Sequence, residues 1–338
     1  MTGILTRRRL WTAIGLSALA LVVVGALALG IGSARASLGA AWAAWRDPAL
    51  RARCVDYQII CEQRLPRVLL AALVGGGLGL TGTAFQAILR NPLADPYTLG
   101  VASGSAVGAV VAMTLRLDVT WGPFGSVQLA SLLGAAAMVA LIYRLGVRRR
   151  ELRVEALLLG GVTVALISSS AIIILRTMSD PLNLIAVDRW YLGGLAAVSV
   201  RDVVAILPLL LAGSAVILQL AGPYNQLALG EEMAYGRGVD PAAVQRWTFL
   251  AGSLVTAAAV AAAGPIGFVG LIVPHAVRLA LGSDHRLVLP CAALGSGAFL
   301  IVCDTLARTL LAPTELPVGV VTAVLGGPVF VVMLLRRR

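Results

Sequence analysis

Long apolar runs are the feature that most restricts what this chain can fold into. About ten stretches of the sequence are apolar over close to 20 residues, the length that an α-helix needs to cross the hydrocarbon core of a bilayer. A spanning segment must satisfy its own backbone hydrogen bonds, so these runs predict helices. We therefore expect an all-α, polytopic membrane protein whose residues 1–338 form a single transmembrane domain. The predicted spans are residues 10–32, 64–90, 98–115, 123–144, 156–175, 203–220, 247–263, 264–275, 287–310 and 318–335.

The eighth of these runs, residues 264–275, differs from the others because glycine and proline interrupt it repeatedly. Such residues are poor helix formers. We expect a broken crossing here, and a break of this kind survives in a membrane only where protein or a cavity covers the freed backbone groups.

The basic residues exclude one mechanism. All 27 are arginine, and the chain has no lysine. A phosphate-binding P-loop needs a lysine on the phosphates, so this chain does not hydrolyse ATP in that way, and any ATP-driven work must come from a partner. The net charge of +11 does not indicate nucleic acid, because the arginines gather at the ends of the predicted helices, as expected beside an anionic leaflet.

The same arginines predict an orientation. Clusters at the N-terminus, between the fourth and fifth spans and at the C-terminus place those segments and both termini in the cytoplasm of a bacterial inner membrane. They comprise Arg7, Arg8, Arg9, Arg144, Arg148, Arg149, Arg150, Arg153, Arg336, Arg337 and Arg338. Residues 34–63 then lie outside. A cleaved signal peptide is the alternative for the first run, which is longer than the usual apolar region of about 7 to 15 residues.

Residues 227–241 are a polar interruption between two long apolar runs. Glu231 and Glu232 follow Gly230, so both carboxylates would lie at a helix N-terminus, where the helix dipole stabilises them. Gly238 permits a sharp reversal after this helix. We expect a short helix that projects into water and contacts a partner; a solvated loop between spans is the alternative.

Cysteines and histidines do not form a recognisable metal site. Cys54 and Cys61 would bridge only if the segment between them were not helical, because a continuous helix holds these positions about 10 Å apart. His275 and His285 have no partner at a fixed spacing, and we interpret each as a hydrogen-bonded turn residue.

From Arg64 to the C-terminus the sequence resembles the FecCD-like permease subunits of ABC importers for iron chelates, haem and cobalamin. The resemblance rests on four motifs in order: RLPRVLLAALVGGGLGLTGTAFQAILRNPLADPYTLGVASG, LALGEEMAYGRGV, AAGPIGFVGLIVPHAVRL and DTLARTLLAPTELPVGVVTAVLGGPVF. It implies the type II importer fold with ten spans and a homodimer in membrane lipid. It also implies two ATPase subunits that hold ATP and magnesium, and a periplasmic or lipid-anchored binding protein. No cofactor is expected on this chain.

The resemblance also assigns roles to residues. Gly230, Glu231 and Ala234 match the cytoplasmic loop that couples such permeases to the ATPase, and Glu232 and Gly238 belong to the same segment. Arg64, Arg67 and Arg308 match arginines on the outer side that receive glutamates of the binding protein. Anchoring of a helix end is the alternative for Arg64 and Arg67, and an ion pair with Asp304 four residues earlier is the alternative for Arg308.

Asn91 and Leu93 match the cytoplasmic gate of the family. Pro92 restricts the backbone of Asn91 to an extended conformation, so a symmetric pair of these loops could close a pore. A capped helix end is the alternative. The basic loop from Arg148 to Arg153 departs from the family pattern and leaves the other half of the gate unassigned.

These observations predict a transport subunit without enzymatic activity of its own. It would move a metal chelate by alternating access, with ferric siderophore as the first choice and cobalamin or haem as alternatives. A proton-coupled transporter that uses Asp304 and Arg308 is a rival, but it leaves the Glu231 segment unexplained. An intramembrane hydrolase is a weaker rival, because no serine stands in a nucleophile setting with His275.

Overall fold

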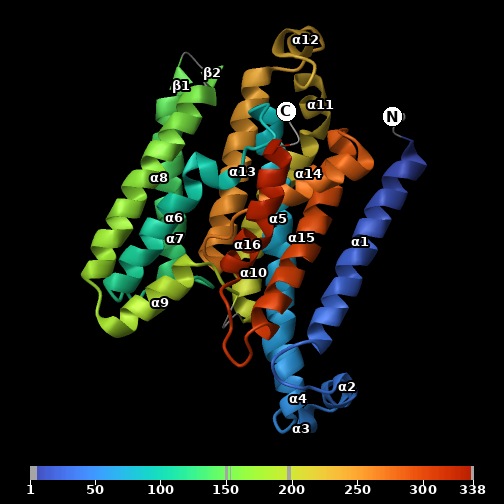
Figure 1. The fold of residues 1–338 in the computed structure, drawn as a ribbon, viewed down its shortest axis with the longest axis vertical. Helices are drawn as coiled ribbons and strands as arrows, with labels where there is room; N and C mark the ends of the chain where they lie inside the picture. The colour runs from blue at the N-terminus through green and yellow to red at the C-terminus, as the bar shows by residue number, and fades with distance from the viewer. Residues whose placement is uncertain (1–5, 149–150, 153, 196–198, 336–338) are drawn as a thin grey trace.

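The computed structural model describes residues 6–148, 151–152, 154–195 and 199–335, and these form a bundle of helices (Figure 1). The all-α prediction is confirmed; the one sheet in the described residues is a pair of two-residue strands. The elements are α1 (Arg7–Gly30), α2 (Leu38–Arg46), α3 (Pro48–Arg51), α4 (Val55–Tyr57), a π-helical stretch (Gln58–Arg64), α5 (Leu65–Ile88), a 3-10 helix (Pro96–Leu99), α6 (Val101–Thr114), α7 (Ser126–Gly146), β1 (Val147–Arg148), β2 (Glu151–Leu152), α8 (Val154–Thr177), α9 (Pro181–Tyr191), α10 (Val200–Gln219), α11 (Ala221–Leu227), α12 (Glu231–Gly236), α13 (Pro241–Ala263), α14 (Val269–Leu281), α15 (His285–Thr309) and α16 (Val318–Leu335).

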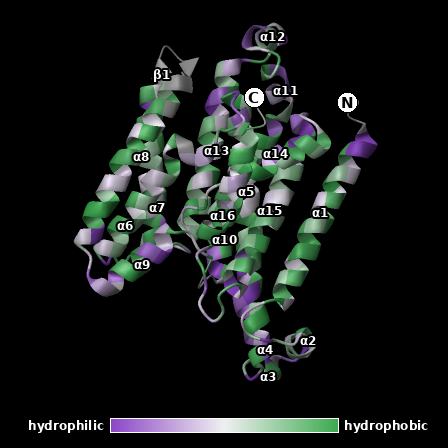
Figure 2. Ribbon diagram, in the orientation of Figure 1, coloured by the Kyte–Doolittle hydropathy of each residue, from purple (hydrophilic) through white to green (hydrophobic). Residues whose placement is uncertain are grey.

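The bundle has two ends, which we name after the short helices there. The α12 end carries α12, the strands β1 and β2 and the start of α1, and the α2 end carries α2, α3 and α4 (Figure 1). Apolar residues cover the long helices between the two ends (Figure 2). Among the described residues, seven helices are long and apolar enough to cross a membrane, and α6, α14 and α16 are shorter apolar helices. Together they correspond to the ten predicted spans.

Helix α5 is the centre of the bundle, and small residues let its neighbours approach closely. A Cβ added at Gly79 would collide with Ser296 of α15, and one added at Gly82 would collide with the Gly270 carbonyl of α14. On another face, Gly252 of α13 lies against the ring of Phe85. Close packing of this kind holds membrane helices together, since burial of apolar area provides little driving force in lipid. The glycines of α5 are therefore points of close contact with α14 and α15.

Two predicted boundaries need correction. The seventh span begins at Pro241 and not near residue 247, because Asp240 caps the helix by accepting hydrogen bonds from the Ala242 and Ala243 amides. The eighth run is broken only over residues 264–268. From Val269 it is a regular helix, α14, that continues through Pro274 to Leu281.

The reason that α14 tolerates Pro274 lies in α5. A proline inside a helix has no N–H for the carbonyl four residues earlier, which here belongs to Gly270. The Gln86 side chain, 5% exposed, donates Nε2–H to that carbonyl at 3.2 Å and also to the Ala94 carbonyl at 3.2 Å. Arg278 in turn donates to Gln86 Oε1. A neighbouring helix thus supplies the hydrogen bond that the proline removes.

The segment between α1 and α5 is helical where the two cysteines lie. Val55–Tyr57 and Gln58–Arg64 form a continuous helical stretch between Cys54 and Cys61, and both cysteines are free. The condition for a disulfide is therefore not met. The predicted arginine clusters are only partly visible, because Arg149, Arg150, Arg153 and Arg336 to Arg338 lie outside the described residues.

Candidate functional site

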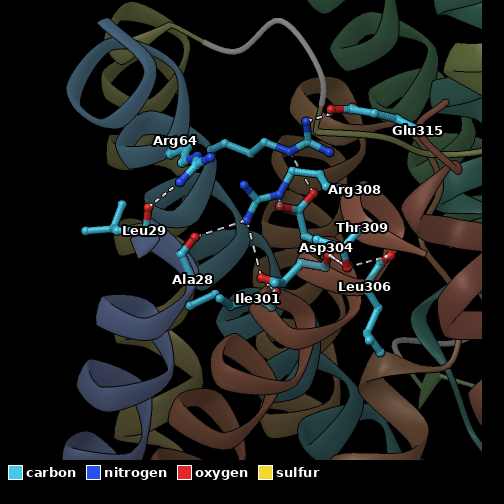
Figure 3. Close-up of polar contacts among 11 residues, drawn as sticks. Ala28, Leu29, Arg64, Ile301, Asp304, Leu306, Arg308, Thr309 and Glu315 are labelled. Atoms are coloured by element: carbon cyan, nitrogen blue, oxygen red, sulfur yellow. Dashed lines mark hydrogen bonds and ion pairs between the residues drawn. The ribbon is translucent and has the colours of Figure 1, made fainter. Parts of the chain in front are cut away.

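At the α2 end, charged residues from α5, α15 and the α15–α16 loop form one buried cluster (Figure 3). Arg67 Nε lies 2.8 Å from Asp304 Oδ1, and Arg67 Nη1 lies 2.9 Å from Glu315 Oε2. Arg308 Nε lies 3.1 Å from Asp304 Oδ2, the i, i+4 pair that the sequence offered as an alternative role for Arg308. The Asp304 side chain is 1% exposed. One buried carboxylate therefore pairs with two arginines, Arg67 and Arg308.

Arg64 and Arg308 also secure the end of α1. Arg64 donates to the carbonyls of Leu29, at 2.8 Å, and Ala34, while Arg308 donates to the Ala28 carbonyl at 3.4 Å. The last carbonyls of a helix have no partner within it and carry partial negative charge, so a guanidinium group there satisfies them and stabilises the helix dipole. Arg64 thus holds the end of α1, a contact that the sequence did not indicate.

The three arginines predicted to receive a binding protein therefore do come together, but they are not displayed as exposed charges. Arg64 is 5% and Arg308 is 4% exposed. All three line a cavity of about 360 Å³, with Gly32 to Ala34 and Glu315 on its wall. A carboxylate from a partner would have to enter this cavity. Docking stays a prediction.

This geometry weakens the rival interpretation of Asp304 as a proton carrier. Both carboxylate oxygens lie within 3.1 Å of an arginine, so this carboxyl group already forms two ion pairs. Glu315 is the member of the cluster that the sequence reasoning missed. Its only sequence signal was an acidic residue in the loop before the last span, close to Arg308.

At the α12 end, the predicted coupling segment is a helix that protrudes from the bundle (Figure 1). Gly230, with φ at 117°, precedes α12, and Gly238, with φ at 79°, follows it, so both turns use backbone conformations that glycine adopts readily. Ala234 is fully buried and fixes the helix to the bundle. The predicted helix at Glu231 is present, and its contact with a partner stays a prediction.

The outward surface of this segment is both apolar and acidic. Leu229, Met233 and Tyr235 are 51%, 51% and 73% exposed, and Glu231 and Glu232 are exposed in the first turn. Glu231 is held from two sides: Arg90 Nη2 lies 3.2 Å from its Oε1, and Gln245 Nε2 lies 3.4 Å from the same oxygen. The sequence reasoning did not identify Arg90.

Asn91 and Leu93, the predicted gate residues, lie in the loop directly after Arg90. The Asn91 side chain accepts a hydrogen bond from the Leu93 amide at 3.0 Å, which closes a tight turn around Pro92. Both residues are partly exposed. The turn is local, as the capped-end alternative suggested, and the gate role stays a prediction.

The two histidines are not turn residues. His275 lies inside α14, directly after Pro274. His285 is the first residue of α15, and its Nδ1 and backbone N–H both lie 2.9 Å from Asn225 Oδ1. Its predicted hydrogen bond is therefore confirmed, whereas the turn assignment is wrong because Asp284 caps a helix that begins at His285.

Residues 20–336 match the FecCD transport family. The cobalamin import system permease protein BtuC of Halobacterium salinarum is 43% identical over 82% of this chain and 74% of its own length. The hemin transport system permease protein HmuU of Yersinia pestis is 39% identical over 81% of this chain and 82% of its own length. A solved structure described as an inward-facing conformation of a metal-chelate type ABC transporter has a TM-score of 0.82 and 31% identity, covering 96% of this chain and 98% of the other.

Proposed function

The chain belongs to the FecCD transport family, and on that premise we propose that it is the membrane-spanning subunit of an ATP-driven importer that moves a metal chelate into the cell. It is a multi-pass membrane permease and not an enzyme, because its relatives are the permease components of such importers and leave ATP hydrolysis to a separate subunit. The proposal concerns the partners, the direction of transport and the cargo.

The observation that carries the proposal is the protruding surface of residues 229–235. This surface combines exposed Leu229, Met233 and Tyr235 with the two carboxylates of Glu231 and Glu232. Exposed apolar residues with a charged rim are typical of a surface that another protein covers. We propose that an ATPase subunit binds here, which makes the α12 end cytoplasmic.

The α2 end then faces outward and receives the binding protein. The cavity lined by Arg64, Arg67 and Arg308 would accept an acidic side chain, since a guanidinium group binds a carboxylate through two parallel hydrogen bonds. We further propose that two copies of the chain pair in the membrane. Their Asn91 to Leu93 turns, both at the α12 end, would then face one another and close the path.

For the cargo we propose a bulky metal chelate. Relatives named for cobalamin and hemin support these two classes, and a ferric siderophore, the first choice from the sequence, is kept as the third candidate. Selection among the three would lie chiefly in the binding protein. Transport assays with each compound on the same reconstituted complex distinguish them.

The proposal is tested by reversing both charges on α12. The chain and its ATPase are reconstituted in proteoliposomes and supplied with the binding protein, and co-purification of the ATPase and ATP-dependent uptake are measured for the Glu231→Arg/Glu232→Arg variant. Asp118→Arg, in the exposed loop between α6 and α7 at the opposite end, is the control. We expect the double variant to fold but to lose ATPase binding and uptake. Unchanged uptake in the double variant would rule out α12 as the docking surface.

A further inference from the structure

The α12 segment and the predicted gate are joined by one ion pair. Arg90 Nη2 lies 3.2 Å from Glu231 Oε1, and Arg90 is the residue directly before Asn91. The side chain of Arg90 therefore ties the start of this loop to α12, and a displacement of α12 would reach the loop through Arg90.

The backbone at Arg90 is suited to transmit such a displacement. Its φ is 46°, in the left-handed region that non-glycine residues seldom occupy, so α5 ends sharply and the chain changes direction at this residue. The Asn91 side chain then holds the next turn by its bond to the Leu93 amide. The turn from Asn91 to Leu93 is thus held by its own hydrogen bond and is connected to α5 through the strained backbone of Arg90.

The far side of the loop is fixed more firmly. The Ala94 carbonyl accepts from Gln86, which is 5% exposed and also bonded to α14 and Arg278. The Arg90 and Glu231 side chains are 48% and 54% exposed, respectively. Ion pairs that are open to water contribute little and exchange readily, whereas buried hydrogen-bond networks are rigid. The loop is therefore anchored at Ala94 and adjustable at Arg90.

From this asymmetry we propose that Arg90 is a positioning residue that couples α12 to the gate. Movement of α12 by the ATPase, through Glu231, shifts Arg90, and the turn from Asn91 to Leu93 follows while Ala94 stays in place. The inference rests on the proposed function, because it needs an ATPase at α12 and a gate at Asn91.

The test separates coupling from assembly. Arg90 is changed to Asn, which tolerates positive φ and removes the charge, to Gln as a second neutral variant, and to Lys, which keeps the charge. Arg286→Gln removes another exposed arginine, in the first turn of α15, as a matched control. Each variant, in complex with the ATPase and binding protein, is assayed for ATPase binding, ATP hydrolysis and cargo transported per ATP hydrolysed.

We expect the Asn and Gln variants to bind the ATPase and hydrolyse ATP as the wild type does. Their transport per ATP should fall by about two- to fivefold, the range that a half-exposed ion pair supports. Lysine should restore most of this loss, and the Arg286 variant should match the wild type. The inference is overturned if the neutral variants transport normally, if they lose ATPase binding, or if lysine is as defective as asparagine. A wild-type chain that binds no ATPase would instead refute the proposed function.

Discussion

Asp304→Asn should destabilise the fold far more than any other neutralisation in the charged cluster at the α2 end. The substitution keeps the shape of the side chain and removes the charge that lies 2.8 Å from Arg67 and 3.1 Å from Arg308. Arg67 retains Glu315 at 2.9 Å. The Arg308 side chain, 5% exposed, retains Thr305 Oγ1 at 3.3 Å and the Ala28 carbonyl at 3.4 Å as its partners among the described residues, and neither is charged.

The size of the expected loss in stability follows from the partners that Arg67 and Arg308 keep. One buried cation is left without a counter-charge, and breaking a buried pair in this way costs about 3 to 5 kcal/mol. The matched control is Glu315→Gln. Glu315 is 31% exposed and Arg67 keeps Asp304, so that change should cost about 1 kcal/mol or less. A double variant, Asp304→Leu with Arg308→Met, removes both charges of the pair and should recover most of the loss.

The measurement is the free energy of unfolding of each purified variant in mixed micelles, by titration with a denaturing detergent. Equal losses for Asp304→Asn and Glu315→Gln would refute the reasoning, since they would mean that water in the neighbouring cavity already solvates the cluster. A double variant as unstable as Asp304→Asn would also contradict it, because the deficit would then come from packing and not from an unpaired charge.

Three further predictions concern other parts of the chain. Gly82→Val should prevent correct packing of α5 against α14, because the added Cβ collides with the Gly270 carbonyl, and should lower the yield and monodispersity of the detergent-solubilised protein. Gly15→Ala on α1, whose added Cβ has nothing within 4 Å, should leave both quantities unchanged. The Arg67→Lys variant should fold normally but bind the binding protein about tenfold more weakly, because it loses one charged hydrogen bond of about 1.5 kcal/mol. The affinity of the wild type should fall as the salt concentration rises. Equal affinities for the wild type and the variant would mean that Arg67 only anchors a helix. Non-reducing mass spectrometry should find free thiols at Cys54 and Cys61, and a bridged peptide would show that the helix between them unwinds.

The parts of the fold that depend on local pattern could be predicted from the sequence. Long apolar runs located the spans, because each helix in a bilayer must satisfy its own backbone. The pair Glu231 and Glu232, next to Gly230, indicated a helix outside the membrane. The boundary at Pro241 was also signalled by Asp240, a favoured capping residue, and was misplaced because apolarity alone was used to locate the helix start.

The parts that depend on contacts between distant segments could not be predicted. Arg67 and Asp304 are 237 positions apart, and nothing local shows that one carboxylate serves two arginines. The continuity of α14 was missed for the same reason. The relevant signal was a glutamine inside an apolar span, but its partner, the carbonyl freed by Pro274, lies on another helix. The pair of Arg90 and Glu231 likewise joins two loops whose proximity only the fold creates.

The attachment of α1 has a consequence for the order in which the chain is made. Only Ala13 and Ala28 of α1 are buried, and the end of the helix is held by Arg64 and Arg308. Arg308 leaves the ribosome 278 residues after Gly30, since 308 minus 30 is 278. At about 5 to 20 residues per second this takes about 14 to 56 seconds. During synthesis Arg64 can therefore hold the end of α1 early, whereas the bond from Arg308 to the Ala28 carbonyl forms only after α15 has been made.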